Sequence, residues 1–363
     1  MSEPITAQAV VVRAPGARAL VEPIVVEPPG PGEVRVRVLA SGVCHTDLHC
    51  RQGEFGRSFP YQLGHEATAM VESVGPGVQS PAVGDVVALA WRSPCGVCRF
   101  CAAGRLAHCA RPVTAEPRMR TSDGLPLGRV LGLGTFATHT VVAAAQAIPL
   151  PTGLGHEASC LIGCAVATGV GAVLHVARVP VGASVAVIGC GAVGLSVVQG
   201  ARLARAGRII AVDRVARKLD WARGFGATDL VDASEPEPVA RVRELAGGRG
   251  VDFAFEAVGL SETLGQALKV CDLGGTSVLI GVPARAAELA LPMADFFYAR
   301  RSLVATSFGD CLPARDIPLF ARLALRGELD LDGMVTERIA LGDVEPAFEA
   351  MRAGRVVRSV ITM

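Results

Sequence analysis

Hydrophobic and polar positions alternate in short runs along the first part of the chain. The run Glu33–Val38 alternates charged residues with valine, and residues 84–90 form another such run. Alternation of this kind is typical of strands that bury one face. It predicts mainly antiparallel strands across residues 1–165.

The pattern changes between residues 166 and 306. Apolar runs at 184–189, 207–213, 251–256 and 276–281 are separated there by helical stretches. Buried parallel strands flanked by helices have this pattern. The segment 307–363 is mixed again, and we expect it to rejoin the first domain. The sequence therefore predicts an α/β protein in which a doubly wound parallel sheet accompanies a mainly antiparallel β domain.

Composition narrows the possible functions. The chain has 363 residues, half of them hydrophobic, and a formal net charge of +1. It can bury two cores, and it lacks the charge that favours binding to nucleic acid or anionic membranes. We identify no secretory signal, and the longest apolar stretch, 184–198, is too short for a membrane span. We therefore expect a cytoplasmic protein whose cysteines are reduced or bound to metal.

Four cysteines lie in one short segment of the first domain. Four thiols this close together indicate a metal ion, and tetrahedral zinc is the one they prefer. The sequence thus predicts a zinc lobe at about 91–112. A zinc ribbon that binds nucleic acid would use the same cysteines, but the neutral charge argues against it. The proposed ligands are Cys95, Cys98, Cys101 and Cys109.

A dinucleotide-binding fingerprint follows the first apolar run of the second domain. Gly189, Gly191 and Gly194 stand between a predicted strand and a predicted helix. In this motif the first glycine allows a tight turn, the second lets the backbone approach a pyrophosphate, and the third lets helix and strand pack closely. The alternative is an ordinary glycine turn, which the flanking strand and helix make less favourable.

Asp213 ends the next predicted strand, where a carboxylate can bind the ribose diol of a dinucleotide. The same charge repels a 2′-phosphate, so we expect NAD rather than NADP. Arg214 could instead pair with that phosphate, and Lys218 lies one helical turn further on. The alternative for Asp213 is a carboxylate that only caps the following helix.

Cys44, His65 and Cys164 are possible ligands of a second metal, although sequence spacing alone does not show that they converge. The chain as a whole resembles the zinc-containing medium-chain alcohol dehydrogenases. Four blocks carry the resemblance: Gly-Val-Cys-His-Thr-Asp at 42–47, Gly-His-Glu at 64–66, the four-cysteine lobe, and the glycine fingerprint with its aspartate.

The resemblance implies a Rossmann NAD-binding domain at 166–306 and a GroES-like catalytic domain made of 1–165 and 307–363. It also implies two zinc ions per chain. Cys44, His65 and Cys164 would hold a catalytic zinc with a fourth position open, whereas the four-cysteine lobe would hold a closed structural zinc. A non-catalytic NAD-binding protein of this fold would lack the catalytic ligands.

The resemblance assigns roles to residues around the catalytic zinc. Glu66 would stand beside the metal, and Asp47 would hydrogen-bond the ring of His65. Thr46 would contact the zinc-bound oxygen, and His49 would pass the proton to solvent. The residues expected to contact the cofactor are His45, Thr168, Gly189, Gly191, Gly194, Asp213, Lys218, Val282 and Arg358.

The implied reaction interconverts a primary alcohol and its aldehyde. The alcohol hydroxyl would bind zinc and lose its proton through Thr46 toward His49, and hydride would pass to NAD. The expected pocket residues, Phe55, Trp91 and Val130, favour an apolar or aromatic alcohol.

Within the family, the chain resembles the branch of glutathione- and mycothiol-dependent formaldehyde dehydrogenases, above all the actinobacterial mycothiol type. Stretches at 91–92, 219–228, 295–297 and 309–316 carry this likeness. That branch tends to lack a histidine at the position of His49, and a relay histidine suits simple alcohols. S-(hydroxymethyl)mycothiol is therefore the alternative substrate, and the candidates to bind its carboxylate are Arg57, Arg118 and Arg120.

Assembly is a further implication of the resemblance. Relatives form dimers or tetramers through the edge of the cofactor-domain sheet, and the strand near 276–280 is the expected contact. An edge strand protected by its own loops is the alternative. The remaining cysteines are expected to be buried packing residues: Cys50, Cys160, Cys190, Cys271 and Cys311.

Overall fold

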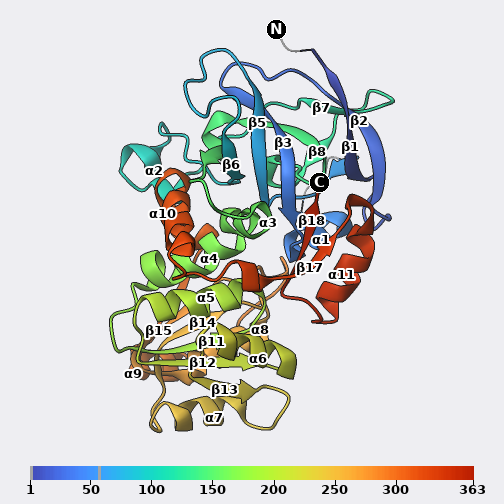
Figure 1. Cartoon of the computed structure of the whole chain (residues 1–363). Helices are drawn as coiled ribbons and strands as arrows, with labels where there is room; N and C mark the ends of the chain where they lie inside the picture. Colours follow the sequence, from blue (N-terminus) through green and yellow to red (C-terminus); the bar gives the residue numbers. More distant parts are fainter. Residues whose placement is uncertain (1–2, 56–58) are drawn as a thin grey trace. The chain divides into compact units, whose positions relative to one another are not determined.

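The computed structural model describes residues 3–55 and 59–363, which divide into two compact units (Figure 1). The first unit contains the chain up to Cys164 and from Leu312 onward, and the second is Ala165–Cys311. The second boundary lies beyond the expected residue 306, because the preceding turn packs on the second unit. The thiol of Cys311 donates a hydrogen bond to the carbonyl of Ala167 at 3.2 Å.

Residues 165–311, all of them described, form a six-stranded parallel sheet in the order β13-β12-β11-β14-β15-β16. This is the order of a doubly wound dinucleotide-binding sheet, so the predicted fold class is confirmed. The expectation of an edge strand near 276–280 is wrong, because β15 pairs on both sides and β16 is the edge. The strands are β11 (Ser184–Ile188), β12 (Arg208–Asp213), β13 (Asp229–Asp232), β14 (Val251–Glu256), β15 (Cys271–Leu279) and β16 (Ser302–Ala305).

Except for the first one, the helices of the second unit follow its strands. Alanine, valine and isoleucine side chains of the central strands form a buried core with the helices, as expected for parallel strands covered on both faces. The helices are α4 (Ala165–Gly171), α5 (Ala192–Leu203), α6 (Ala216–Phe225), α7 (Pro238–Leu245), α8 (Ser261–Val270) and α9 (Met293–Ala299).

Two sheets form the described part of the first unit. One has the order β7-β2-β1-β4-β8, and the other has the order β10-β6-β5-β3-β18-β17 with β9 beside β3. Most pairs are antiparallel, as the alternating pattern predicts. The strands are β1 (Ile5–Val12), β2 (Leu20–Val26), β3 (Glu33–Gly42), β4 (Tyr61–Gln62), β5 (Ala67–Val74), β6 (Val86–Leu89), β7 (Met119–Thr121), β8 (Gly128–Arg129), β9 (His139–Ala143), β10 (Ala147–Pro149), β17 (Val335–Ile339) and β18 (Arg358–Thr362).

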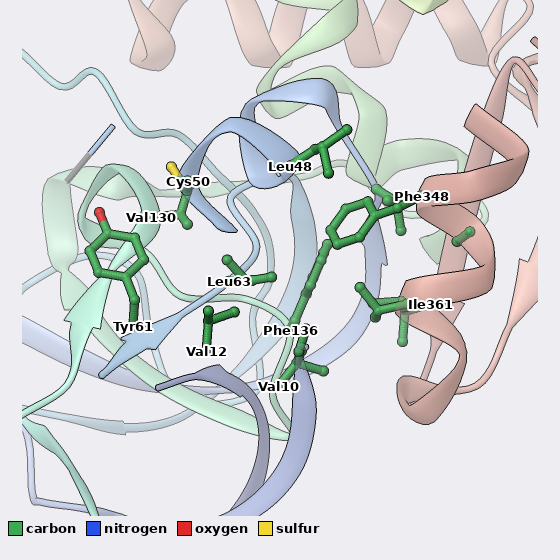
Figure 2. Packing of buried hydrophobic residues seen from close by; sticks show 14 of the residues in the cluster. Val10, Val12, Leu48, Cys50, Tyr61, Leu63, Val130, Phe136, Phe348 and Ile361 are labelled. Carbon is green, nitrogen blue, oxygen red and sulfur yellow. The ribbon is translucent and has the colours of Figure 1, made fainter. Parts of the chain in front are cut away.

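A buried core joins the beginning and the end of the chain in the first unit. Val10 and Phe136 pack there with Leu63, and Phe348 and Ile361 come from the last segment (Figure 2). This packing holds helix α1 (His45–Gln52) near helix α11 (Val344–Arg352). The unit also contains α2 (Arg99–Ala102), α3 (His156–Ser159) and α10 (Pro313–Leu325).

No single helix in the described ranges is long and apolar enough to cross a membrane. The consecutive stretches His156–Gly163 and Ala165–Ala177 together meet such a test of length and composition, and most of their residues are buried. The five cysteines outside the proposed metal sites are buried as well.

Replacing Phe136 by alanine should lower the free energy of unfolding of the first unit by about 3–5 kcal/mol, because it leaves a cavity in a closed core. The chain has two tryptophans, and Trp91 alone reports on this unit in a Trp221→Phe background. Urea unfolding followed by its fluorescence measures the change. Val83→Ala, at a side chain that is 61% exposed, is the control; an equal loss in both variants would contradict the assignment.

Candidate active site

Three metal-binding side chains from distant parts of the sequence converge in the first unit. The ligand atoms of Cys44, His65 and Cys164 all lie within 4.8 Å of one another. Cys44 precedes α1, His65 lies between β4 and β5, and Cys164 follows a 3-10 turn. The register of β3 and β5 explains why Cys44 and His65 lie close together. Ser41 pairs with Ala67, which places the chain after Gly42 beside the chain before Ala67.

Asp47 orients this cluster from α1. Its Oδ1 lies 3.0 Å from Nδ1 of His65, the contact that the resemblance implied, and accepts a hydrogen bond from the backbone of Gly64 at 2.9 Å. Its Oδ2 accepts one from the backbone of Cys44 at 3.1 Å. Because the ring donates through Nδ1, Nε2 is left to face the thiols, and it lies 3.4 Å from Sγ of Cys164.

The electrostatics of the cluster suit a soft cation. The hydrogen bond from Cys164 holds the pKa of the Cys44 thiol well below 9.0, and the charge of Arg358 adds to this effect. Sharing its proton with Cys44 raises the pKa of Cys164. Burial alone would lower the pKa of His65, but the Asp47 carboxylate raises it well above 6.5. One imidazole nitrogen and two sulfurs form a donor set that fits zinc with a fourth position open.

Glu66 and Arg358 form a buried ion pair next to Cys44. Nε of Arg358 lies 3.1 Å from Oε2 of Glu66, and its Nη1 donates to the carbonyl of Val43 at 2.7 Å. Gly42 is needed here, because a Cβ would lie 2.3 Å from the Glu66 carboxylate. Arg358, one of the residues expected to contact the cofactor, is only 4% exposed and pairs with the buried carboxylate of Glu66, which needs a counter-charge.

Helix α1 carries three more of the expected residues. His45 is exposed, Thr46 is half-buried beside Cys44, and His49 follows one turn later. The ring of His49 bonds through Nδ1 to the carboxylate of Glu54, a partner that the sequence analysis missed. The signal in the sequence was Gly53, a residue suited to ending the helix, followed directly by the acidic residue Glu54.

The residues expected to line a substrate pocket differ in their burial and packing. Val130 has no exposed surface and packs beside Phe136 in the core, so the pocket role assigned to it is corrected. Phe55 packs against the same core from outside, whereas Trp91 packs on the β3–β5–β6 cluster. Val282 lies in the second unit and is exposed.

The four-cysteine lobe is compact. The ligand atoms of Cys95, Cys98, Cys101 and Cys109 also lie within 4.8 Å of one another. Backbone N–H groups of Cys95 and Cys98 point at sulfurs of Cys109 and Cys95, at 3.3 and 3.4 Å. Four sulfurs with backbone donors could hold a metal with no coordination position left for a substrate.

The glycine fingerprint has the geometry that its spacing predicts. Gly189 has a φ of 93°, and a Cβ at Gly194 would lie 1.8 Å from the carbonyl oxygen of Gly189. α5 can therefore begin this close to the turn only with glycine at both positions. A Cβ at Gly191 would meet nothing within 4 Å, so open space remains in front of the turn.

Asp213 is hydrogen-bonded to the glycine turn. Its Oδ2 accepts a hydrogen bond from the backbone of Cys190 at 2.8 Å, and its Oδ1 accepts one from Val215, before α6, at 3.0 Å. Nζ of Lys218 lies 3.9 Å away. The carboxylate thus orders the fingerprint and the following helix, and ribose binding is a separate proposal. Thr168 is half-buried on α4 of this unit.

Two family models match the chain. Residues 30–152 match the alcohol dehydrogenase GroES-like domain, and residues 192–325 match the zinc-binding dehydrogenase model. The S-(hydroxymethyl)glutathione dehydrogenase of Escherichia coli O157:H7 is 37% identical over 98% of this chain and 99% of its own. The chain belongs to the zinc-containing medium-chain alcohol dehydrogenase family.

Solved structures of this dehydrogenase family are similar along the whole chain. An alcohol dehydrogenase zinc-binding domain protein from Burkholderia ambifaria has a TM-score of 0.94 at 33% identity, covering 99% of this chain and 100% of that one. Benzyl alcohol dehydrogenase from Acinetobacter calcoaceticus has a TM-score of 0.92 at 28% identity, with 99% of both chains covered. A zinc-binding dehydrogenase from Sinorhizobium meliloti 1021, bound to NADP, has a TM-score of 0.84 at 28% identity, with 99% and 100% covered.

Glu256 is a residue of this dehydrogenase that the sequence analysis missed. It ends β14, and its Oε1 accepts hydrogen bonds from the backbones of Val258 and Gly259 at 2.9 and 2.7 Å. The turn that it holds packs against the fingerprint, since a Cβ at Gly189 would lie 2.5 Å from Val258. The signal was a carboxylate at the end of an otherwise apolar strand.

Replacing Asp47 by asparagine should weaken zinc binding at Cys44, His65 and Cys164 by about 10- to 100-fold, because the ring loses its charged partner and an amide N–H group faces backbone donors. Chelator competition followed by metal analysis measures this. Asp85→Asn is the matched control, since Asp85 also accepts a backbone hydrogen bond, from Ala82. Unchanged affinity in Asp47→Asn would contradict the orienting role.

Proposed function

We propose that this family member is an NAD-dependent alcohol dehydrogenase that interconverts primary apolar or aromatic alcohols and their aldehydes. The observation that carries the proposal is the buried cluster of Cys44, His65 and Cys164, with Nε2 of the ring aimed at the thiols. Three protein ligands leave one position for a substrate oxygen. The similarity to benzyl alcohol dehydrogenase supports an aromatic alcohol.

The proposal includes two zinc ions per chain, one in this cluster and one in the four-cysteine lobe. Bound zinc would supply Lewis-acid polarisation of the substrate oxygen, and NAD would accept the hydride. Of the chain's own residues, Thr46 would hydrogen-bond the substrate hydroxyl and His49 would take its proton on toward solvent. Asp47 holds the ligand ring, and the pair of Glu66 and Arg358 holds the backbone before Cys44.

NAD is proposed over NADP because of Asp213. Its carboxylate lies at the end of β12 beside the glycine turn, where a 2′-phosphate would meet a negative charge. The NADP-bound relative from Sinorhizobium meliloti shows that both cofactors must be tested. Arg214, which follows Asp213, is the group that would pair with a 2′-phosphate if the preference were reversed, and Lys218 lies close by.

Oxidation of S-(hydroxymethyl)mycothiol is the second candidate, favoured by the 37% identity to a glutathione-adduct dehydrogenase. The candidate arginines give it little support. Nε of Arg118 already bonds to Glu33 at 2.8 Å, and Arg120 lies exposed on β7. Arg57 lies outside the described residues.

Zinc-loaded protein should reduce NAD with benzyl alcohol in the absence of any thiol, and Cys44→Ser should abolish this activity by removing a metal ligand. NADH absorbance is the measurement, with NADP, and with formaldehyde plus mycothiol or glutathione, as comparison arms. Turnover only in the formaldehyde and thiol arm would reject the simple-alcohol proposal in favour of the second candidate.

We also propose that the protein is a homo-oligomer, a dimer or a tetramer, that pairs through β16. This strand is the edge of the parallel sheet, and exposed apolar side chains precede it. Met293, Phe297 and Tyr298 on α9 are 84%, 74% and 77% exposed, a larger apolar group than isolated surface residues make. Leu291, Phe296 and their neighbours line a shallow hollow of about 440 Å³ there.

Replacing Phe297 by glutamate should shift the protein toward the monomer, because a charge would enter the proposed interface. Sedimentation velocity gives the mass. Val181→Glu is the matched control, because Val181 is 75% exposed in the same unit but lies before β11. A monomeric wild-type protein, or an unchanged oligomer in Phe297→Glu, would reject β16 as the interface.

A further inference from the structure

The end of helix α1 brings an acidic side chain back onto His49. The helix ends at Gln52, and Gly53 takes the left-handed conformation with φ of 81°. The backbone N–H of Glu54 then bonds to the carbonyl of His49 at 3.0 Å. A Cβ at Gly53 would also lie 2.8 Å from Pro15, so the reversal depends on glycine. As a result, a carboxylate five positions along the chain reaches Nδ1 of the His49 ring.

The carboxylate of Glu54 is held at both oxygens. Oε2 contacts the histidine ring, and Oε1 accepts a hydrogen bond at 2.9 Å from the side-chain amide of Gln52, oriented to satisfy both of its neighbours. The amide oxygen in turn accepts one from Nη2 of Arg352 at 2.6 Å. Arg352 ends α11, which packs in the same core as α1. The contact to His49 is therefore built from two helices rather than from one mobile side chain.

Phe55 holds the histidine ring from another direction. The two rings meet edge to face with centroids 5.5 Å apart. The His49 side chain is still 33% exposed, so it can exchange a proton with solvent. A histidine ring that donates a hydrogen bond from Nδ1–H to a carboxylate keeps Nε2 free as a proton acceptor. The carboxylate also stabilises the imidazolium that forms when Nε2 is protonated.

We propose that Glu54 is a positioning residue that fixes His49 in the Nδ1–H tautomer and makes Nε2 the atom that takes up the substrate's proton. The proposal rests on the proposed function. The O–H bond of the substrate breaks and its electron pair stays on the substrate oxygen. The Thr46 hydroxyl takes up that proton as it gives up its own, and an Nε2–H bond forms on His49. The imidazolium later returns the proton to water. The alternative is that Glu54 only closes the end of α1, as an exposed ion pair of little energetic value.

A double-mutant cycle separates the two roles. Glu54→Ala should lower kcat about tenfold in the wild-type background, with little change in the KM for alcohol, and should have no further effect when His49→Gln is already present. Glu54→Gln keeps an acceptor for Nδ1–H without the charge, and should show an intermediate loss. Equal losses from Glu54→Ala in both backgrounds would overturn the proposal.

Glu345→Ala is the matched control. Glu345 lies on α11 and pairs with Arg51 of α1 at 2.8 Å, but it does not contact His49 in the described structure. Its loss should lower the melting temperature without lowering kcat. If Glu345→Ala lowered kcat as much as Glu54→Ala, the effect would be one of helix docking and the proposal would fail.

The tautomer gives a readout that does not depend on turnover. In nitrogen-15 spectra of histidine-labelled full-length protein, the His49 signal, assigned by its loss in His49→Gln, should report Nδ1–H in the wild type. It should move toward Nε2–H, the form that water favours, in Glu54→Ala. An Nε2–H ring in the wild type would overturn the proposal. A wild type that oxidises no alcohol or thiol adduct would reject the proposed function alone, because this spectrum still tests Glu54.

Discussion

A carboxylate with no exposed surface holds the candidate metal site together. Asp47 accepts hydrogen bonds from the backbones of Cys44 and Gly64 and from the ring of His65, so one side chain joins helix α1 to the segment before β5. Burying this charge would be costly without these donors. The ring, in turn, would lose the acceptor that fixes which of its nitrogens faces the thiols. The backbone position of Cys44 and the ring orientation of His65 therefore depend on the same residue.

The ion pair of Glu66 and Arg358 also stabilises the site, and its arginine comes from the last strand of the chain. Its geometry requires a glycine at position 42, and its arginine also holds the carbonyl of Val43. The peptide group between Val43 and Cys44 is thus held at both its carbonyl and its N–H group. A site built in this way can keep its donor atoms close together before a metal arrives, which reduces the ordering that binding must supply.

The sequence predicts features that depend on local pattern. Apolar runs separated by helices indicate the parallel sheet, and close cysteines or glycines indicate a metal lobe and a nucleotide turn. Convergence of Cys44, His65 and Cys164 depends instead on strand register and on a distant turn, so only the family resemblance pointed to it. The pairing of Arg358 with Glu66, the burial of Val130 and the edge position of β16 are long-range outcomes of the same kind. No local pattern encodes them, since each depends on which segment packs beside it.

Because the second unit interrupts the first in the sequence, the two units can complete their folding at different times during translation. The second unit is one continuous segment, Ala165–Cys311, whereas the first is interrupted by it. During translation the nucleotide-binding unit can emerge and fold while β18 is still unmade, and domains generally fold as units in this way. Until β18 arrives, the end of β3 at residues 40–42 lacks its pairing strand and Glu66 lacks its counter-charge. The nascent protein would thus hold a finished nucleotide-binding unit while its metal site is still incomplete, because the strand that carries Arg358 is made last.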